Sequence, residues 1–165
     1  MHIRKAEIND LSDILQIYIC ARQFMIDTGN PNQWGQINPP PERTKEDINE
    51  QNLYVVEEDT EILGVFYYRF GDDPTYTVIY NGSWLNDKPY GVIHRIAVSN
   101  KARGKGLAGL CFDFAFSNCR NLKIDTHKDN KVMQKALSKY GFVECGIIHL
   151  ANGDERIAFQ KAEGT

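Results

Sequence analysis

The chain has 165 residues, of which 42% are hydrophobic and 25% are charged. This length suits one globular domain with a real core and leaves no room for a second, so we expect a single domain over residues 1–165. The formal net charge of -3 excludes a general attraction for nucleic acid, and a polyanionic ligand would need a local basic patch.

The cysteines and the N-terminal segment bear on the cellular compartment. The four cysteines form no CxxC pair, and no histidine or cysteine cluster has the spacing of metal ligands. We therefore expect neither a disulfide framework nor a metal site, which suits a reducing cytoplasm. MHIRKAEIND lacks the apolar core of a signal peptide, and no apolar run approaches the roughly 20 residues that span a bilayer. The sequence predicts a cytoplasmic protein without nucleic-acid or membrane partners.

The first half of the chain predicts a strand, two helices and further strands. A strand at 2–6 precedes a helix capped by Asn9 or Asp10, in which apolar residues recur at helical spacing. Segment 28–44 carries four prolines and two glycines, which predicts a loop before a short polar helix around 45–50. The β-branched and aromatic runs at 53–59 and 61–70 predict an antiparallel hairpin. A third run, 75–80, predicts a strand that turns at Asn81-Gly82.

The second half alternates strands and helices. The pattern predicts strands at 91–99 and 121–126, helices at about 106–119 and 130–140, and final strands at 144–150 and 156–161 that meet at Asn152-Gly153. A helical crossover joins the strand ending at Val98 to the one ending at Thr126, so these two should be parallel neighbours in a mostly antiparallel sheet. The predicted fold class is α/β, a mixed sheet flanked by helices.

The segment HRIAVSNKARGKGLAGLCFDFAF runs from a strand through glycines into a helix. Gly104 and Gly106 allow a sharp turn and a close approach of the backbone to a ligand, and the first N–H groups of the helix favour an anion. Lys101, Arg103 and Lys105 add positive charge. These features predict a phosphate-binding loop, with a glycine turn between solvated cations as the alternative.

This loop resembles the acetyl-CoA signature of the GNAT acetyltransferase superfamily, Arg/Gln-x-x-Gly-x-Gly/Ala between a strand and a helix. Arg103, Gly106 and Ala108 match it. The segment from Asn130 to Phe142 and the order of elements are also similar, so the resemblance covers nearly the whole chain.

A dinucleotide-binding loop fits less well. GxGxxG occurs at Gly104, Gly106 and Gly109, but dinucleotide binders place that motif after the first strand of a parallel sheet. In this chain the strands predicted before the GxGxxG motif form hairpins, which argues against a dinucleotide-binding fold.

The resemblance implies a GNAT fold in which the parallel strands splay apart, and an N-acetyltransferase in which a primary amine attacks the thioester of acetyl-CoA directly in a ternary complex. Acetyl-CoA would be the acetyl donor, with its pyrophosphate on the backbone of the loop and its pantetheine arm paired with the strand before it. A backbone N–H at the splayed point would polarise the thioester carbonyl. The residues implied in binding acetyl-CoA are Ile96, Ala97, Val98, Arg103, Gly104, Lys105, Gly106, Leu107, Ala108 and Asn130. Asn130 has a second interpretation as a helix cap.

An amine must be neutral to attack a thioester, so a base is expected. His94 is the first candidate, because strand alternation places it on one face with Ile96 and Val98, and Arg95 on the other. A hydrogen-bonded structural histidine is the alternative. His127 is the second candidate, with Asp125 nearby to orient its ring, or it is a loop residue.

The leaving thiolate needs a proton, and many members of the family supply it from a tyrosine on the helix after the asparagine. That position is Leu137 in this chain. Tyr140 lies three residues later, almost one helical turn, and is the candidate acid, with core packing as its alternative role. Water is a further alternative, because a thiolate is a tolerable leaving group.

The acceptor side has weaker signals. Trp34, Trp84 and Tyr90 lie in predicted loops, and they could form an aromatic wall for the acceptor or anchor the loops. The acceptor is expected to be a small-molecule or peptide amine, and polyamine, amino acid, aminoglycoside-like amine and protein lysine all stay open. The resemblance also leaves a homodimer open. Because the family tyrosine is missing, a catalytically weak CoA-binding regulatory or sensor module is a second functional hypothesis, and a nucleotide-phosphate binder is a third.

Overall fold

The computed structural model describes residues 1–164, and Thr165, the last residue of the expected domain, lies outside the described residues. The strands are β1 (His2–Lys5), β2 (Leu53–Glu58), β3 (Glu61–Phe70), β4 (Gly91–Val98), β5 (Asn121–Thr126), β6 (Val143–His149) and β7 (Glu155–Ala162). The helices are α1 (Leu11–Asp27), α2 (Pro41–Asn49), α3 (Leu107–Cys119) and α4 (Lys131–Lys139), with short 3-10 turns η1 (Ile8–Asp10), η2 (Pro74–Tyr76) and η3 (Asn100–Ala102).

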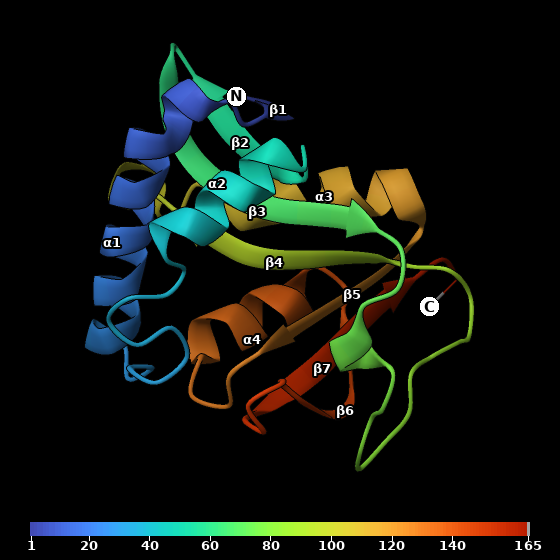
Figure 1. The fold of residues 1–165 in the computed structure, drawn as a ribbon. Helices are drawn as coiled ribbons and strands as arrows, with labels where there is room; N and C mark the ends of the chain where they lie inside the picture. The colour runs from blue at the N-terminus through green and yellow to red at the C-terminus, as the bar shows by residue number, and fades with distance from the viewer. Residues whose placement is uncertain (165) are drawn as a thin grey trace. The chain divides into compact units, whose positions relative to one another are not determined.

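These strands form a seven-stranded sheet in the order β1-β2-β3-β4-β5-β7-β6 (Figure 1). The sheet is mostly antiparallel, and β4 pairs with β5 in parallel. The predicted mixed α/β fold class and its parallel pair are therefore confirmed. Within residues 1–164, no helix is both long enough and apolar enough to cross a membrane.

The described chain divides into two compact units. Met1–Tyr68 and His94–Cys111 form the first unit, and the rest of the described chain forms the second. Three elements pass between them, since β3 belongs to the second unit from Arg69, β4 belongs to it up to Ile93, and α3 belongs to it from Phe112 onward. The expectation of a single domain stays a prediction.

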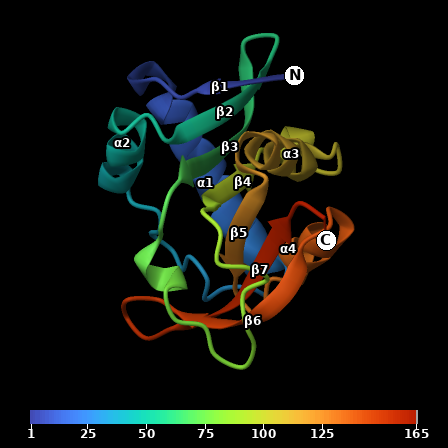
Figure 2. The ribbon, with the colours of Figure 1, turned by 90° about the vertical axis from the view of Figure 1, so that its right-hand side faces the viewer.

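The first unit contains β1, β2 and β3 in an antiparallel arrangement. The predicted hairpin is confirmed, and its two connecting residues, Asp59 and Thr60, both have left-handed backbones (φ 50° and 68°), as a two-residue hairpin loop requires. Helices α1 and α2 cover one face of these strands, and α3 begins on the other (Figures 1 and 2). Gly64 permits this close approach, because a Cβ there would lie 3.0 Å from the Leu107 side chain.

Two expectations in this unit needed correction. The second helix begins at Pro41 rather than near 45, because proline at the first helical position lacks only an N–H that the helix leaves unpaired. Asp10 stands at the N-cap of α1, but its carboxylate makes no cap hydrogen bond to that helix. It accepts instead from the Glu7 N–H at 2.7 Å and from Arg4.

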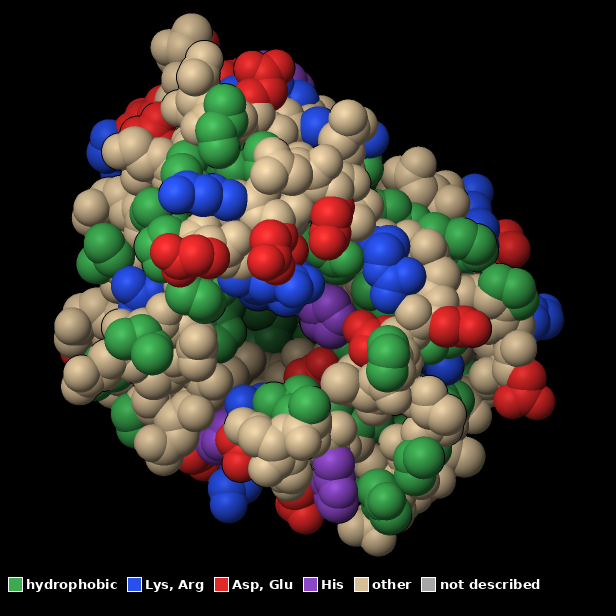
Figure 3. Space-filling view, viewed as in Figure 1, with side chains coloured by type: hydrophobic (Ala, Val, Ile, Leu, Met, Phe, Trp, Pro, Cys, Tyr) green, Lys and Arg blue, Asp and Glu red, His purple; other side chains and the backbone are tan. Residues whose placement is uncertain are grey.

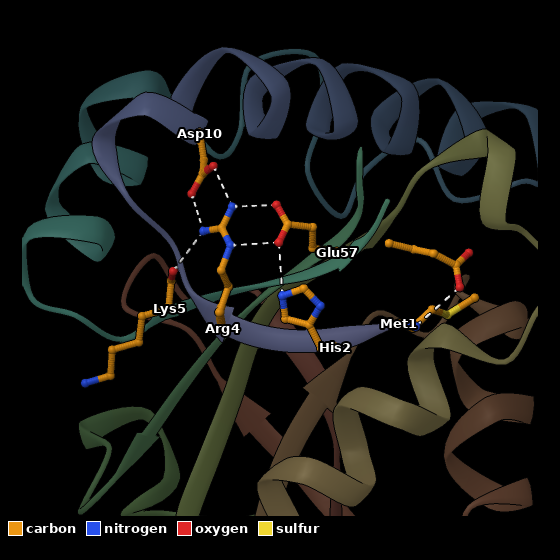
Figure 4. Close-up of polar contacts among 7 residues, drawn as sticks. Met1, His2, Arg4, Lys5, Asp10 and Glu57 are labelled. Atoms are coloured by element: carbon orange, nitrogen blue, oxygen red, sulfur yellow. Dashed lines mark hydrogen bonds and ion pairs between the residues drawn. The ribbon is translucent and has the colours of Figure 1, made fainter. Parts of the chain in front are cut away.

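Arg4 connects β1, η1 and β2 through an ion cluster (Figure 4). Its guanidinium donates to both oxygens of Asp10 at 2.8 and 2.9 Å and to Glu57 at 3.1 and 3.3 Å. His2 lies 3.0 Å from the same Glu57 carboxylate. The hydrogen bonds from Arg4 hold the pKa of Asp10 below its usual range. The first strand is thus fixed by charge as well as by its ladder.

In the second unit, β7 lies between β5 and β6 (Figure 2), and the β6–β7 hairpin and both helices were predicted within a few residues. The predicted strand at 75–80 is wrong. The Asp73 side chain accepts from the Thr75 N–H and hydroxyl at 3.0 and 2.6 Å and starts the 3-10 turn η2. Only Tyr80 makes a bridge, to Ile147 of β6.

The segment between β3 and β4 makes several side-chain hydrogen bonds to β5 and β7. Asn121 donates to the carbonyls of Lys88 and Pro89 at 3.2 and 3.1 Å, and the Gln160 side chain accepts from the Leu85 N–H at 2.8 Å. Gln160 is fully buried and also donates to Asn121 at 2.7 Å. These hydrogen bonds and the buried rings of Tyr76 and Tyr90 hold the segment without a strand ladder, so its structure could not be predicted from a strand period.

Candidate functional site

The loop after β4 has the backbone that its glycines predicted. Ser99 starts η3 by accepting from the Lys101 N–H at 3.3 Å, and Gly104 and Gly106 both have φ of 78°. Helix α3 begins at Leu107, directly after the second glycine. A left-handed backbone is unfavourable for residues with a Cβ, so the two glycines make this sharp entry into a helix N-terminus possible.

Arg103 is fixed beside that helix N-terminus. Its guanidinium carbon lies 3.5 Å from the centre of the Phe24 ring on α1, and its Nε and Nη2 donate to Asn100 Oδ1 at 3.2 and 2.9 Å. Burial lowers the pKa of Arg103. Lys101 forms an ion pair with Glu61, so part of the predicted positive charge is neutralised by the protein itself. On the face drawn in Figure 3, basic and acidic side chains are interspersed.

Strand β4 departs from simple alternation at Arg95. Its φ of 50° is left-handed, although it is not a glycine. As a result the Tyr67 ring contacts both neighbours: the Arg95 guanidinium carbon lies 4.5 Å and the His94 ring 5.9 Å from the Tyr67 ring centre. The expectation that His94 and Arg95 lie on opposite faces is therefore wrong, because the period of two holds only for a uniformly extended backbone.

The Arg95 side chain forms an ion pair with a buried carboxylate of α2. Its Nε and Nη2 donate to the two oxygens of Asp47 at 2.7 and 3.0 Å, and the Asp47 side chain is fully buried. Arg43, one turn earlier on α2, places its Nε 3.3 Å from the same carboxylate. The strained backbone of β4 is thus stabilised by a paired charge.

Trp34 belongs to the same unit and packs against α1. Its ring meets the Tyr18 ring edge-on, with centroids 5.6 Å apart. The Tyr18 hydroxyl is buried and has no hydrogen-bond partner among residues 1–164. Burial raises the pKa of Tyr18, while the charge of Arg95 lowers it and the charge of Asp47 raises it. These contacts define a group of side chains, the Arg95 cluster, made up of Tyr18, Trp34, Asp47, Tyr67 and Arg95.

In the second unit, Trp84 and Tyr90 bracket one lysine. Lys123 Nζ lies 4.1 Å from the Trp84 ring centre and 3.8 Å from that of Tyr90. Trp84 also donates from Nε1 to the Tyr76 carbonyl at 2.9 Å, and the Tyr90 hydroxyl accepts from the Asp73 N–H at 2.9 Å. These contacts suit loop anchors, and a role for either ring in acceptor binding stays a prediction.

His127 follows β5 in a tight loop. Its Nδ1 accepts from the Asp129 N–H at 3.0 Å, and burial lowers its pKa. Asp125, expected to orient this ring, instead accepts a hydrogen bond from the Tyr76 hydroxyl at 2.7 Å. His127 as a base stays a prediction.

The two candidates on α4 lie at its two ends. Asn130 is the N-cap and accepts from the Met133 N–H at 2.9 Å, as the helix-cap interpretation predicts. Tyr140 is the C-cap, and its ring packs edge-on against Phe112 at 5.9 Å. The position of the family tyrosine, Leu137, is fully buried.

A protein-family model decides the family. The model described as the Acetyltransferase (GNAT) family matches residues 13–142. The chain belongs to the GNAT acetyltransferase family. No curated protein matches this GNAT chain.

Solved structures agree with this assignment. A GNAT-family acetyltransferase from Streptococcus agalactiae is 31% identical, with a TM-score of 0.90 over 99% of this chain and 96% of that one. A GNAT-family acetyltransferase from Listeria monocytogenes shares the fold at 20% identity, with a TM-score of 0.72 over 97% and 93% of the two chains. The NatC complex bound to Gag peptide and CoA shares it at 13% identity, with a TM-score of 0.64 over 98% and 97%.

Sequence reasoning identified the loop of this GNAT protein but missed the side chains around it. Phe24 and Tyr18 lie on α1 at helical spacing, which indicates core packing and nothing more. For Asp47 the sequence predicted only a position on a short polar helix, not a buried carboxylate. A charged residue inside a strand, such as Arg95, was the available hint, because buried charges need partners.

Proposed function

We propose that this GNAT protein is an acetyl-CoA-dependent N-acetyltransferase that moves the acetyl group to a primary amine by direct attack in a ternary complex. The observation that carries the proposal is the loop after β4, where two left-handed glycines lead straight into the N-terminus of α3. A Cβ at Gly104 would meet nothing within 4 Å, so the turn is open beside the helix. Helix N–H groups and Arg103 are suited to the pyrophosphate of acetyl-CoA.

The remaining cofactor contacts follow the family pattern. The backbone of Ile96, Ala97 and Val98 would pair with the pantetheine arm, Lys105, Leu107 and Ala108 would contribute to the phosphate loop, and Asn130 would contact the pantetheine. In the reaction the amine nitrogen bonds to the thioester carbon, the carbon–sulfur bond breaks, and the thiolate of CoA leaves. A backbone N–H near Ile96 would stabilise the oxyanion.

Proton transfer is assigned to His94. It is half-buried in β4, and the strained Arg95 separates it from Ile96, the first of the strand residues proposed for the pantetheine. It would take the proton of the amine, with His127 as the alternative base. Tyr140 or water would protonate the thiolate. Trp34 is proposed to contact the acceptor, which is a small-molecule or peptide amine, and we propose that the enzyme acts in the cytoplasm.

Calorimetric titration of the full chain with acetyl-CoA, ATP and NAD tests the proposal. Acetyl-CoA should bind and the other two should not. Gly106→Glu, which places a negative side chain in the loop, should abolish binding. Gly153→Glu is a matched control, because Gly153 also has a left-handed backbone, in the β6–β7 turn, with open space around it. Equal binding by both variants would refute the phosphate loop.

A second candidate function rests on Leu137. Its buried apolar side chain removes the family's acid, so a catalytically weak CoA-binding regulatory or sensor module is the alternative. Release of CoA in the presence of a panel of amines distinguishes the two. Tight acetyl-CoA binding without release by any amine would favour the module.

A further inference from the structure

The Arg95 cluster combines a strained backbone, which the ion pair with Asp47 stabilises, with a buried polar group that has no partner among residues 1–164. A non-glycine residue at φ of 50° within a strand is an unusual feature that points toward function. The buried, unpartnered hydroxyl of Tyr18 is the second such feature. Buried polar atoms in proteins almost always have partners, and an unmade hydrogen bond there is costly.

The carboxylate of the cluster is already committed to the protein. Asp47 receives Nε and Nη2 of Arg95 and lies within ion-pair distance of Nε of Arg43. It is fully buried and has little capacity left for a ligand amine. What remains are donors: Nη1 of Arg95, which has no partner among residues 1–164, and the Tyr18 hydroxyl, which burial keeps protonated.

The charges around the cluster favour a singly charged anion over a phosphate. Arg95 and Arg43 carry two positive charges, and their partners Asp47 and Glu46 carry two negative charges, so the four charges sum to zero. Because no excess positive charge is present, a carboxylate, with one negative charge, leaves less charge uncompensated than a phosphate would.

The location suits the acceptor rather than acetyl-CoA. Tyr67 contacts both Arg95 and His94, the proposed base, so a group bound at Arg95 lies beside the group that would deprotonate the amine. The Arg95 side chain is 19% exposed and can be reached by a ligand. Tyr18 is fully buried, so a ligand reaches its hydroxyl only when neighbouring groups move, and Trp34, on the loop between α1 and α2, packs against the Tyr18 ring.

We propose that the Arg95 cluster is a subsite for a carboxylate, and that the acceptor is therefore an amino acid or another amine that carries a carboxylate group. The inference rests on the proposed acetyltransferase function. Arg95 binds the carboxylate through Nη1, and Tyr18 donates its hydroxyl to the same group. Asp47 is a positioning residue, since it fixes the guanidinium without touching the acceptor.

Matched acceptors test the subsite. The probes are amino acids and their decarboxylated amines, such as L-phenylalanine with phenethylamine and L-histidine with histamine, assayed by CoA release at saturating acetyl-CoA. For at least one pair the wild type should favour the acid by about 10- to 100-fold in kcat/KM, the range of a hydrogen bond to a charged group. Calorimetric binding of the same pairs to the CoA-loaded protein gives the same comparison without turnover.

Tyr18→Phe is the decisive variant, because it removes one oxygen that bonds to no described residue. Its thermal midpoint should equal or exceed that of the wild type, while its preference for the acid falls about 10-fold. Tyr80→Phe, which alters a tyrosine of the second unit stacked on His149, should leave the preference unchanged. Arg95→Lys should weaken the preference further, because an ammonium group lacks the fork that serves Asp47 and a ligand together.

The outcomes separate the two proposals. Failure of acetyl-CoA to bind would refute the proposed function. Binding of acetyl-CoA with no preference for the acid in any pair, by turnover and by calorimetry, would overturn only the carboxylate subsite. An unchanged preference in Tyr18→Phe would overturn the role of Tyr18.

Discussion

The Asp47 carboxylate allows a quantitative prediction. Asp47→Asn keeps the size of the side chain but removes the charge that faces two guanidinium groups, and it turns one of the two accepting oxygens into an N–H donor. Removing one partner of a buried ion pair costs about 3–5 kcal/mol. Arg95 and Arg43 are 19% and 44% exposed, so water partly solvates them, and burial raises the pKa of Asp47, which means that its charged form is itself penalised; we therefore take the lower end, about 3 kcal/mol. For a chain of this size this corresponds to about 6–12 °C in the thermal midpoint.

Thermal and urea unfolding followed by circular dichroism measure the effect. Glu46→Gln on the same helix is the matched control, because Glu46 is 60% exposed and lies 3.3 Å from Arg43 alone among the described bases. An exposed pair contributes less than about 1 kcal/mol, so the control should lose less than about 4 °C. If Asp47→Asn lost no more than Glu46→Gln, the carboxylate would not be what stabilises the strained strand.

Three further predictions concern single side chains. Phe24→Leu removes the ring under Arg103 and should raise the Kd for acetyl-CoA about 2- to 5-fold by calorimetry; an unchanged Kd would contradict this. The hydrogen bonds from Arg4 lower the pKa of Asp10 in the folded state. The contribution of Asp10 to the free energy of unfolding is therefore fully present above its unfolded pKa of about 3.9 and is lost as the pH falls through its folded pKa. Urea unfolding should therefore show the wild type more stable than Asp10→Asn at pH 7 but not at pH 2, and a difference independent of pH would refute the Arg4 pairing. Burial also lowers the pKa of Lys123 in the folded state. Below this folded pKa the lysine is charged in both states and its burial reduces the free energy of unfolding in full. As the pH rises from the folded pKa toward the unfolded pKa of about 10.4, this loss of stability disappears. The wild type should gain stability relative to Lys123→Met between pH 7 and pH 10, and a constant difference would show that the lysine is charged in the folded protein throughout.

Features that lie within one stretch of chain could be read from the sequence. The loop from Arg103 to Ala108 is contiguous, so glycine placement, charge and the start of α3 were all visible together. The β2–β3 hairpin and α4 were predicted for the same reason, because periodicity and turn residues act over a few residues.

Only the tertiary structure decided which distant residues meet. Asp47 and Arg95 are 48 residues apart, and Tyr76 and Asp125 are 49 apart. Nothing local announces such pairs, because each depends on chain closure that many other contacts stabilise together. The same closure fixes the left-handed backbone of Arg95, whose cost is offset by a partner on another element. The sequence by itself therefore determined the glycine-containing loop after β4 and most of the strand and helix order, whereas the cluster proposed to select the acceptor exists only once α1, α2, β3 and β4 have packed.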